Sequence, residues 1–503
     1  MDEIELKYQV PPGQALAVDR AVAGRTGAAR QRLQAAYFDT AHGTLAAAGL
    51  ALRLRREGRR WVQTLKSGST DAMTRFEHNA ARGGSAAMPA LDPGLHAEHA
   101  VGRQLLDALH GQEPQALQVQ YRTDILRRSR TVRKAHGQVE LAYDTGHIEA
   151  GAQRLAVCEL EFELLSGSPR AVLEVAQRWA ARFDLWLDGR SKAERGSTLA
   201  RGQVACAPRV AQAVVLTPAM DVSAAWSAVL RSCADQILAN ASQIAGGPCG
   251  PEHVHQLRVG LRRLRSALRL FDPWVAEPAL APPAARLFAA LGQARDRAVL
   301  LGPLAGELRA AMVATGLVPP RDGARHDPLD ADADAADDHE PGAVVRAAPT
   351  QQFLLELLAA MQHVLLDTGD AGDAHAWRRH VKRQLRRWHR QVVDDAGHYA
   401  QLDDTQRHTL RKRAKRLRYA SEFAAALYEP RAVRRYLRAL RELQDRLGAV
   451  SDVVMAGVAL GQAHGEDPVT WFARGWLAAR REHLIDGAVR PLRGFARAPV
   501  FWK

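Results

Sequence analysis

The sequence has few cysteines and lacks the long apolar segments that membrane-spanning proteins need. Its four cysteines form neither a CxxC motif nor a pair with histidine, so neither a zinc site nor a disulfide framework is expected. No uncharged apolar run approaches the length of a transmembrane helix, about 20 residues. The first ten residues, MDEIELKYQV, are charged from the second position, unlike a secretory signal peptide. These absences predict a cytoplasmic protein with no membrane partner.

Acidic residues are in deficit. The chain has 69 Lys and Arg against 55 Asp and Glu, which gives a net charge of +14 and a pI of about 10.1. Such a surplus favours an anionic partner, which can be nucleic acid, a phosphate-rich polymer or an anionic membrane surface. Charge alone does not choose among them. The hydrophobic content of 47% is that of a globular protein, and 503 residues are too many for a single core, so at least two domains are expected.

The first 200 residues favour β-strands. Short segments alternate between apolar and polar residues and are separated by Gly, Asp and Asn. Asp144-Thr-Gly146 predicts a hairpin turn between two of them. One helix is expected, with Ser168 as its N-cap and Pro169 as its first residue, extending to about Phe183. The predicted strands include Ile4–Val10, Ala51–Arg56, Trp61–Lys66, Val139–Tyr143 and Arg154–Leu164.

From about Asp221 the pattern changes to long helices rich in Ala, Leu and Arg. Residues 319–350 interrupt it with an acidic segment poor in apolar residues, which predicts a disordered insertion. The helical part also repeats itself, and two elements that recur in the same order predict a pair of helical bundles. His255-x-x-Arg258-x-x-x-Arg262-Arg263-x-Arg265 recurs as His408-x-x-Arg411-x-x-x-Lys415-Arg416-x-Arg418, and Leu291-Gly292-x-x-x-Asp296 recurs as Leu447-Gly448-x-x-x-Asp452.

Several strand segments place charged residues on one face. Side chains alternate between the two faces of a strand, so every second residue of ExExK, RLR, TLK and ELEFE shares a face. Glutamates two positions apart lie about 6–7 Å from each other and repel unless a cation separates them. A solvated sheet face is the simpler alternative, but such faces rarely carry three carboxylates in a row. The residues concerned are Glu3, Glu5, Lys7, Arg53, Arg55, Lys66, Glu159, Glu161 and Glu163.

If the sheet closes, these charged faces line its interior. Unpaired charges cannot be buried in a dry core, so the interior must hold water, ions or a ligand. Clustered carboxylates suit hard cations such as Mg²⁺ or Mn²⁺. Arginine and lysine suit phosphate oxygens. An interior that contains both predicts a site for a metal and a polyphosphate.

The ExExK opening, the RLR, TLK and ELEFE segments and SKAERG (residues 191–196) resemble the CYTH domain of the triphosphate tunnel metalloenzymes. The resemblance covers residues 1–203 and implies a closed antiparallel eight-stranded β-tunnel. It further implies an enzyme that uses Mg²⁺ or Mn²⁺, two per site, to hydrolyse inorganic triphosphate to pyrophosphate and phosphate. The implied metal ligands are Glu3, Glu5, Asp144, Glu159 and Glu161. The implied catalytic residues are Glu3, Glu5, Lys7, Lys66 and Glu161, and the implied substrate-binding residues are Lys7, Arg53, Arg55, Lys66, Arg75, Arg127, Lys192 and Arg195.

Two of these assignments depend on strand register. Arg127 is preferred to Arg122 and Arg128, although a slip of one residue would exchange the two faces of its strand. Arg75 and Glu77 predict a further pair of inward-facing side chains. Asn79 stands where the alternation requires another carboxylate, so this strand is the least certain part of the match.

Basic residues form a stripe on each repeat of the helical part. The 3-4-3-4 spacing of the first stripe places its residues on one helix face, and the leucines between them form a separate apolar seam. Like charges at this spacing repel, so a stripe of one sign indicates an anionic ligand more than an ordinary solvated face. The stripes comprise His255, Arg258, Arg262, Arg265 and Arg269 in the first repeat, and His408, Arg411, Lys415 and Arg418 in the second.

The two stripes resemble the CHAD domain, a conserved-histidine α-helical domain, over residues 218–503. This resemblance implies that the stripe residues bind inorganic polyphosphate, with association to polyphosphate granules as a further expectation. A CYTH domain followed by CHAD looks like the bacterial inorganic triphosphatases. An adenylate cyclase, a thiamine-triphosphatase and a non-catalytic polyphosphate-binding protein remain alternatives. Nucleic acid is a weaker alternative partner, because the first stripe contains no aromatic residue for base stacking.

Overall fold

The chain folds into two compact units. A computed structural model describes residues 2–503 except 25–26, 69–72, 85, 112–116, 275–277, 318–339, 367–373 and 463–467. The first unit comprises Met1–Val210, Ala234–Leu257 and Val345–Leu366, and the second comprises Ala211–Cys233, Arg258–Val344 and Asp367–Lys503.

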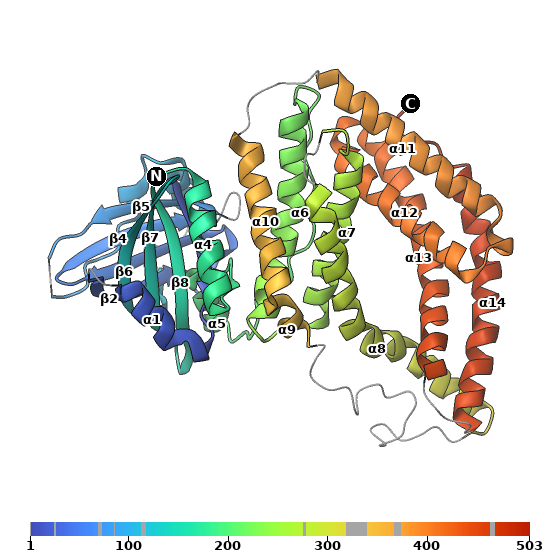
Figure 1. Ribbon diagram of the computed structural model, residues 1–503, viewed down its shortest axis with the longest axis horizontal. Coiled ribbons are helices and arrows are strands. Elements are labelled where there is room, and N and C mark those ends of the chain that lie inside the picture. The colour runs from blue at the N-terminus through green and yellow to red at the C-terminus, as the bar shows by residue number, and fades with distance from the viewer. Residues whose placement is uncertain are drawn as a thin grey trace. The chain divides into compact units, whose positions relative to one another are not determined.

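Eight antiparallel strands form a closed barrel in the first unit (Figure 1). They follow the order β5-β4-β3-β2-β6-β7-β8-β1, and β1 pairs with β5 to close the sheet. A short ninth strand, β9 (Trp186–Leu187), adds to β1. The predicted closed antiparallel barrel is therefore confirmed. Its strands are β1 (Asp2–Gln9), β2 (Ala29–Asp39), β3 (Leu50–Glu57), β4 (Arg60–Ser67), β5 (Thr74–Ala81), β6 (Gln118–Lys134), β7 (Gly137–Ala150) and β8 (Gln153–Gly167).

Alternation gives the barrel an apolar outer face beneath its helices. On β1, Leu6 and Tyr8 are buried, and the Tyr8 ring lies 5.8 Å from that of Phe162 on β8. Helix α4 (Pro169–Phe183) covers this face through contacts with β1, β7 and β8. The helix starts as predicted, because Ser168 takes the extended N-cap conformation. The other helices of the barrel are α1 (Ala15–Ala23), α2 (Thr44–Ala47), α3 (Ala100–Ala108) and α5 (Lys192–Ala200).

The hairpin prediction at Asp144–Gly146 is wrong. Strand β7 runs through this segment, and its turns lie at residues 135–136 and 151–152. A Cβ on Gly146 would lie 2.0 Å from the carbonyl oxygen of Asp124 on the neighbouring β6. The glycine therefore permits two strands to approach closely, a role that its sequence context does not distinguish from a turn.

Several helices that follow the barrel in sequence belong partly or wholly to its unit. They include the C-terminal half of α6 (Val222–Ala245), the start of α7 (Pro251–Leu270) and all of α10 (Ala348–Leu366), which packs against α4. The compact unit therefore extends beyond the domain boundary expected between residues 203 and 218. One reason is polar: the Gln177 amide of α4 donates to Gln352 of α10 at 3.2 Å.

The acidic insertion expected over residues 319–350 lies mostly outside the described residues. From Pro341 onward the chain is helical, as α9 (Pro341–Arg346) and then α10, which corrects the prediction of disorder for this end of the segment. The Glu340 carboxylate accepts the amide protons of Gly342 at 3.0 Å and Ala343 at 2.9 Å. A capping carboxylate followed by proline is a helix start that the acidic composition concealed.

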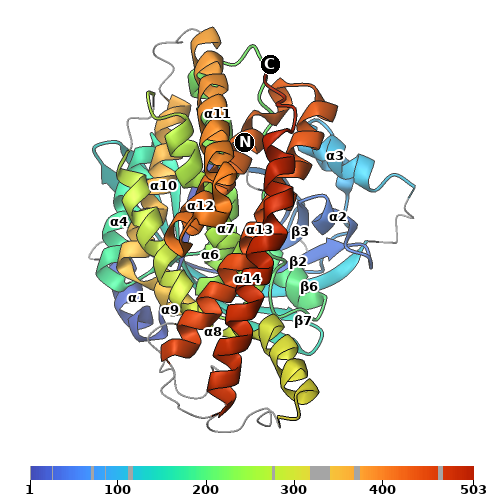
Figure 2. The same ribbon diagram turned by 90° about the vertical axis from the view of Figure 1, so that its right-hand side faces the viewer.

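The second unit is built from helices. Helices α13 (Pro430–Gln462) and α14 (Pro468–Ala496) run side by side, as Figures 1 and 2 both show. On α7 (Pro251–Leu270), Leu261 and Leu264 are fully buried, as the predicted leucine seam requires. No helix within the described ranges is both long and apolar enough to cross a bilayer. The remaining long helices are α8 (Ala281–Ala314), α11 (Ala374–Gly397) and α12 (Asp404–Ala424).

Candidate active site

Charged side chains from several strands meet on the inner face of the barrel. Lys7 stands opposite Glu161 in the pairing of β1 with β8. Asp144 stands opposite Glu159 on β8 and opposite Arg127 on β6. Directly opposite residues share one face of a sheet, so register alone turns these five side chains to the same side. This arrangement is the one that the alternating sequence predicts for a closed sheet.

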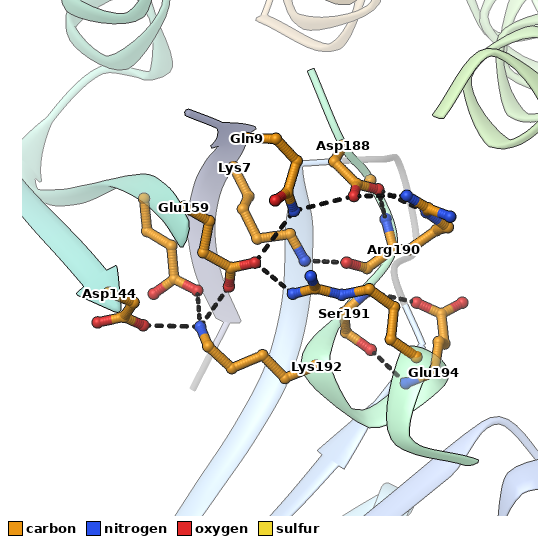
Figure 3. Close-up of polar contacts among 12 residues, drawn as sticks. Lys7, Gln9, Asp144, Glu159, Asp188, Arg190, Ser191, Lys192 and Glu194 are labelled. Carbon is orange, nitrogen blue, oxygen red and sulfur yellow. Dashed lines mark hydrogen bonds and ion pairs between the residues drawn. The ribbon is translucent and has the colours of Figure 1, made fainter. Parts of the chain in front are cut away.

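Lys192 of α5 reaches three of the inner carboxylates (Figure 3). Its ammonium nitrogen lies 2.7 Å from Asp144 and 2.8 Å from Glu161, and it also forms an ion pair with Glu159. Arg127 holds Asp144 with two hydrogen bonds of 2.7 Å and forms an ion pair with Glu161. The side chains of Asp144 and Glu159 are completely buried. The cluster therefore depends on compensating cations.

These cations keep the carboxyl groups ionised. Burial alone would raise the pKa of Glu159, but the charges of Arg195 and Lys192 outweigh it and hold that pKa at about 2. Burial is likewise outweighed at Glu161, where Lys192 and Arg127 hold the pKa well below its usual range. Burial would lower the pKa of Lys192, but the surrounding carboxylates raise it above its ordinary value. At neutral pH the carboxyl groups of Glu159 and Glu161 and the ammonium group of Lys192 are therefore charged.

The three carboxylates fit a divalent cation. One oxygen from each of Asp144, Glu159 and Glu161 lies within 4.8 Å of the other two. Hard cations such as Mg²⁺ bind clusters of carboxylate oxygens, and the Lys192 ammonium supplies positive charge at this position. Asp144, Glu159 and Glu161 form the one such acidic cluster within the part of the chain that the structure describes.

The predicted ligands Glu3 and Glu5 lie in a second group on the inner face. Arg75 Nη1 lies 2.7 Å from Glu5 Oε1, and Lys66 Nζ lies 3.4 Å from Glu3 Oε2. Glu3 stands opposite Arg75 of β5, and Glu5 stands opposite Glu163 of β8, one inward-facing position away from Glu161. The five predicted metal ligands are thus divided between two places in the barrel.

Arg53 is a buried cation whose hydrogen bonds are incomplete. Its Nη1 donates to the Tyr37 hydroxyl at 3.1 Å, and its Nη2 lies 3.6 Å from Glu77, which also pairs with Lys66. The Nε and Nη2 atoms are buried without a hydrogen-bond acceptor. Buried donors of this kind are costly unless a ligand supplies the acceptor. Beside it, burial and the Arg53 charge lower the pKa of Arg55 to about 10, which again favours an anion at this place.

Strand β5 points Arg75 and Glu77 inward, as predicted, and Asn79 follows them on the same face. The Asn79 amide donates to Glu77 at 2.9 Å and accepts from Thr64 at 2.7 Å. An amide can therefore replace a carboxylate here without leaving its neighbours unsatisfied. On β6 the register favours Arg127, because Arg128 turns to the outer face and its Nε lies 2.9 Å from Asp19 of α1.

Helix α5 packs against the inner face of the barrel. Ala193 and Leu199 contact an apolar cluster that includes Tyr121. A Cβ on Gly196 would come within 2.3 Å of the Tyr121 ring, so glycine permits the approach. Ser191 and Glu194 form a capping box that fixes where the helix begins. The start of the helix in turn fixes where Lys192 and Arg195 point.

Sequence reasoning missed a second network at the end of β1. Asp188 is completely buried and accepts from Arg190 Nε at 2.8 Å and from Gln9 at 3.0 Å. Gln9 also donates to Glu159 at 3.2 Å, and Lys7 donates to the Arg190 carbonyl. Burial lowers the pKa of Lys7 to about 8. Gln9 continues the inward alternation of β1, which is the signal that could have found it.

Glu163 faces inward, as the alternation of ELEFE predicts, whereas its neighbour Glu140 was overlooked as an inner-face residue. Glu163 stands opposite both Glu5 and Glu140. Burial, together with the charges of Glu3 and Glu140, raises the pKa of Glu163 to about 7. The alternation of ELEFE predicts its direction, whereas its altered acidity follows only from the neighbours that the barrel supplies.

In the second unit the two basic stripes approach each other. Burial and the charges of Arg262 and Arg411 lower the pKa of Lys415 to about 6, so residues of both repeats act on one ammonium group. Arg258 and Arg262 lie 4.7 and 5.3 Å from the centre of the Phe288 ring. These contacts place guanidinium groups of the first stripe beside an aromatic ring of α8.

The other stripe residues are less concentrated. His255 is half-buried and His408 is exposed, and partial desolvation with nearby cations lowers the pKa of His408. Burial and the exposed Arg269 lower the pKa of Arg265. Asp452, the repeated aspartate of the second copy, lies 3.5 Å from Arg411 Nη2 of the second stripe. Arg418 of the same stripe donates to Glu422 at 2.8 Å and to Gln444 at 2.8 Å. The side chain of Asp296, its counterpart, lies outside the described residues.

Comparison with known proteins gives each part a family. Residues 1–197 match the CYTH domain, and residues 228–461 match the CHAD domain. The chain is a CYTH–CHAD protein. Its CYTH domain is the barrel with the two charged groups, and its CHAD domain carries the basic stripes.

Several known proteins are similar to parts of this chain. An inorganic triphosphatase of Haemophilus influenzae is 27% identical over 210 residues, which cover 40% of this chain and 56% of that protein. The chain thus spans little more than half the length of that relative. The CHAD domain of the plant Ricinus communis is 30% identical with a TM-score of 0.46, covering 59% of this chain and 99% of that one. A Hippeastrum protein, studied as an adenylyl cyclase and described as having a dominant triphosphatase activity, is 19% identical with a TM-score of 0.28, covering 40% and 97%.

Proposed function

We propose that the CYTH domain hydrolyses inorganic triphosphate to pyrophosphate and phosphate with Mg²⁺ or Mn²⁺. The observation that carries this proposal is the pairing, inside one barrel, of a carboxylate cluster with buried cations. Asp144, Glu159 and Glu161 offer oxygens to a metal, and Arg53 offers buried guanidinium donors to which the described residues supply no hydrogen-bond acceptor. A ligand that satisfies both must bind a metal and present many anionic oxygens, as triphosphate does.

Hydrolysis of a phosphoanhydride depends on positioning and charge neutralisation more than on covalent chemistry. Asp144, Glu159 and Glu161 would hold a divalent cation, which would supply positive charge to phosphate oxygens and acidify a bound water. The planar fork of Arg53 suits two phosphate oxygens at once, and Lys66 adds a mobile ammonium beside it. Helix α5 covers apolar inner-face residues and so limits bulk water. The proposed substrate-binding set is Lys7, Arg53, Arg55, Lys66, Arg75, Arg127, Lys192 and Arg195.

Two substitutions test the site. Glu5→Gln removes the charge that Arg75 holds, and Lys66→Ala removes the cation between Glu3 and Glu77. Both should abolish phosphate release from tripolyphosphate while circular dichroism stays unchanged. Lys134→Ala, at the exposed end of β6, is the matched control and should keep full activity. Full activity in either site variant would remove the assignment.

The substrate is tested by a panel. Phosphate release from tripolyphosphate, ATP, thiamine triphosphate and long polyphosphate should be compared with Mg²⁺ and with Mn²⁺. Tripolyphosphate should give the highest kcat/KM. ATP preferred with release of pyrophosphate would favour an adenylate cyclase, and thiamine triphosphate preferred would favour a thiamine-triphosphatase. No turnover of any of the four would leave a non-catalytic polyphosphate-binding protein.

We further propose that the CHAD domain binds inorganic polyphosphate and concentrates the enzyme on it, including at polyphosphate granules. The support is the convergence of Arg262, Arg411 and Lys415 from the two repeats. Polyphosphate should compete better than duplex or single-stranded DNA at matched salt concentrations. Stronger binding of either DNA would overturn this part of the proposal. The proposed ligands are His255, Arg258, Arg262, Arg265, Arg269, His408, Arg411, Lys415 and Arg418.

A further inference from the structure

The segment between α4 and α5 is fastened to helices outside the residues that match the CYTH domain. The Leu187 amide donates to Gln351 Oε1 of α10 at 2.7 Å. The Gly189 amide donates to Ser242 Oγ of α6 at 2.9 Å. Both partners belong to the sequence that matches the CHAD domain and to the same compact unit as the barrel. Side chains of the CHAD sequence thus satisfy backbone donors of the CYTH domain.

Arg190 makes a third connection of this kind. Its Nη1 donates to Gln243 Oε1 of α6 at 3.0 Å. The approach is close, since a Cβ on Gly246 would lie 2.2 Å from Arg190 Nη2. Arg190 also holds Asp188 through its backbone amide and its guanidinium group. The arginine therefore links α6 to the buried acid at the end of β1.

The three fastening side chains are themselves fixed. Ser242, Gln243 and Gln351 are 2%, 3% and 7% exposed. The Gln243 Nε2 donates to the Pro248 carbonyl at 2.6 Å, and the Gln351 Nε2 donates to the Val345 carbonyl at 2.7 Å. Each amide therefore has a defined orientation, with its oxygen turned to the fastened segment. Buried and fully bonded amides of this kind rigidify what they hold.

The opposite side of the same segment touches the proposed active site (Figure 3). The Arg190 carbonyl accepts from the Lys7 ammonium, and the Gly189 carbonyl accepts from Arg75 Nη2 at 2.8 Å. Asp188 reaches Glu159 through Gln9, which donates to both carboxylates. Displacement of the segment would thus displace two cations of the substrate-binding set and disturb the metal-binding cluster.

We infer that Ser242, Gln243 and Gln351 are positioning residues for hydrolysis, so that the CHAD sequence completes the CYTH site. The inference rests on the proposed function for its catalytic part. It follows from the order of contacts: the fastening side chains hold the segment, and the segment holds Lys7 and Arg75. Misplacement of such groups by about 1 Å can cost a hundredfold in rate. None of the three residues contacts the carboxylate cluster in the hydrogen bonds and ion pairs described for them.

The test uses full-length protein with the double substitution Ser242→Ala/Gln243→Leu. Its kcat/KM for tripolyphosphate should fall by roughly 10- to 100-fold, with a raised KM, because Lys7 and Arg75 hold substrate. Loss of folded enzyme would lower the apparent kcat and leave KM unchanged. The matched control is Gln236→Leu, a substitution of another buried amide of α6 that binds Gln256 at 2.7 Å. Ser242→Thr keeps the hydroxyl and should retain activity.

Hydrogen exchange separates the positioning role from the choice of substrate. In the absence of any phosphate, the Gly189 amide should exchange faster in the double variant than in wild type or in Gln236→Leu, and the Leu187 amide should exchange faster in Gln351→Leu. Unchanged exchange would overturn the inference, as would an unchanged KM and kcat in an active enzyme. Wild-type protein inert towards tripolyphosphate would instead overturn the proposed function, and faster exchange would then still support the fastening.

Discussion

Replacing Lys192 by methionine should reveal the charge balance of the carboxylate cluster. Three carboxylates, Asp144, Glu159 and Glu161, face three cations, Lys192, Arg127 and Arg195. The Lys192 side chain is 13% exposed, so little solvent screens its ion pairs. Removing one partner of a buried ion pair costs about 3–5 kcal/mol, because the remaining charge stays buried. The variant should therefore be much less stable than wild type without metal.

The expected shift can be stated as a melting temperature. For a domain of this size, 1 kcal/mol corresponds to about 2–4 °C, so the Tm of the barrel unit should fall by roughly 6–20 °C in EDTA. Mn²⁺ should then raise the Tm of the variant more than that of wild type, because no ammonium has to be displaced. A ligand at 100 times its Kd contributes about 2.7 kcal/mol, or roughly 5–11 °C.

Differential scanning calorimetry of the full chain, with EDTA and with Mn²⁺, measures both effects. Lys192→Arg retains the charge and should lose less stability, whereas Lys134→Met removes an exposed lysine and should change nothing. An unaltered Tm of Lys192→Met in EDTA would refute the electrostatic reasoning. An Mn²⁺ shift equal to that of wild type would refute the assignment of the metal to this cluster.

Three other predictions follow from separate features. Gly196→Ala should lower the free energy of unfolding by about 1–3 kcal/mol and reduce activity, because the new Cβ would lie 2.3 Å from the Tyr121 ring. Urea unfolding measures the loss of stability. The control is Gly13→Ala, where nothing lies within 4 Å of the new Cβ, and an equal loss in both variants would contradict the prediction. Burial lowers the pKa of His96 to about 4, below the unfolded value of about 6.5. The unfolded state therefore binds more protons, and the free energy of unfolding should fall as the pH drops from 6.5 to 4. His96→Gln should weaken this pH dependence, and an unaltered pH profile in that variant would exclude the role of His96. Polyphosphate binding at pH 7 should take up a proton, because burial holds the pKa of Lys415 at about 6 and a bound anion raises that pKa. The affinity should therefore rise as the pH falls from 8 to 6. Calorimetry in buffers of different ionisation enthalpy measures the proton uptake, and binding without proton uptake would contradict the prediction.

Strand alternation was sufficient to predict the inner face of the barrel. The period of two in ExExK and ELEFE survives in any closed sheet, so Glu5, Lys7 and Glu161 point inward as expected. The same local rule failed at Gly146, because a turn glycine and a close-packing glycine look alike in sequence. It also missed the helical start at Pro341, where Glu340 provides the cap.

The pairing of charges could not be predicted, because it depends on segments that are distant in sequence. The position of Lys192 among three carboxylates follows from the entry of α5 into the inner face. The ion pair between Glu5 and Arg75 follows from the closure of the sheet, where β1 pairs with β5. The role of Gln351 needed the fold, since a buried glutamine on a helix has no signature of its own.

The barrel unit is discontinuous in sequence, and this has a consequence for biosynthesis. Its third part, Val345–Leu366, leaves the ribosome 156 residues after Val210, the end of its first part (366 − 210 = 156). At about 5–20 residues per second, translation needs roughly 8–30 s for this stretch. During that interval the nascent barrel lacks Gln351, which accepts the Leu187 amide proton, and lacks α10, which packs against α4. A chaperone that binds the nascent chain could cover the exposed surface of α4 until α10 has been synthesised.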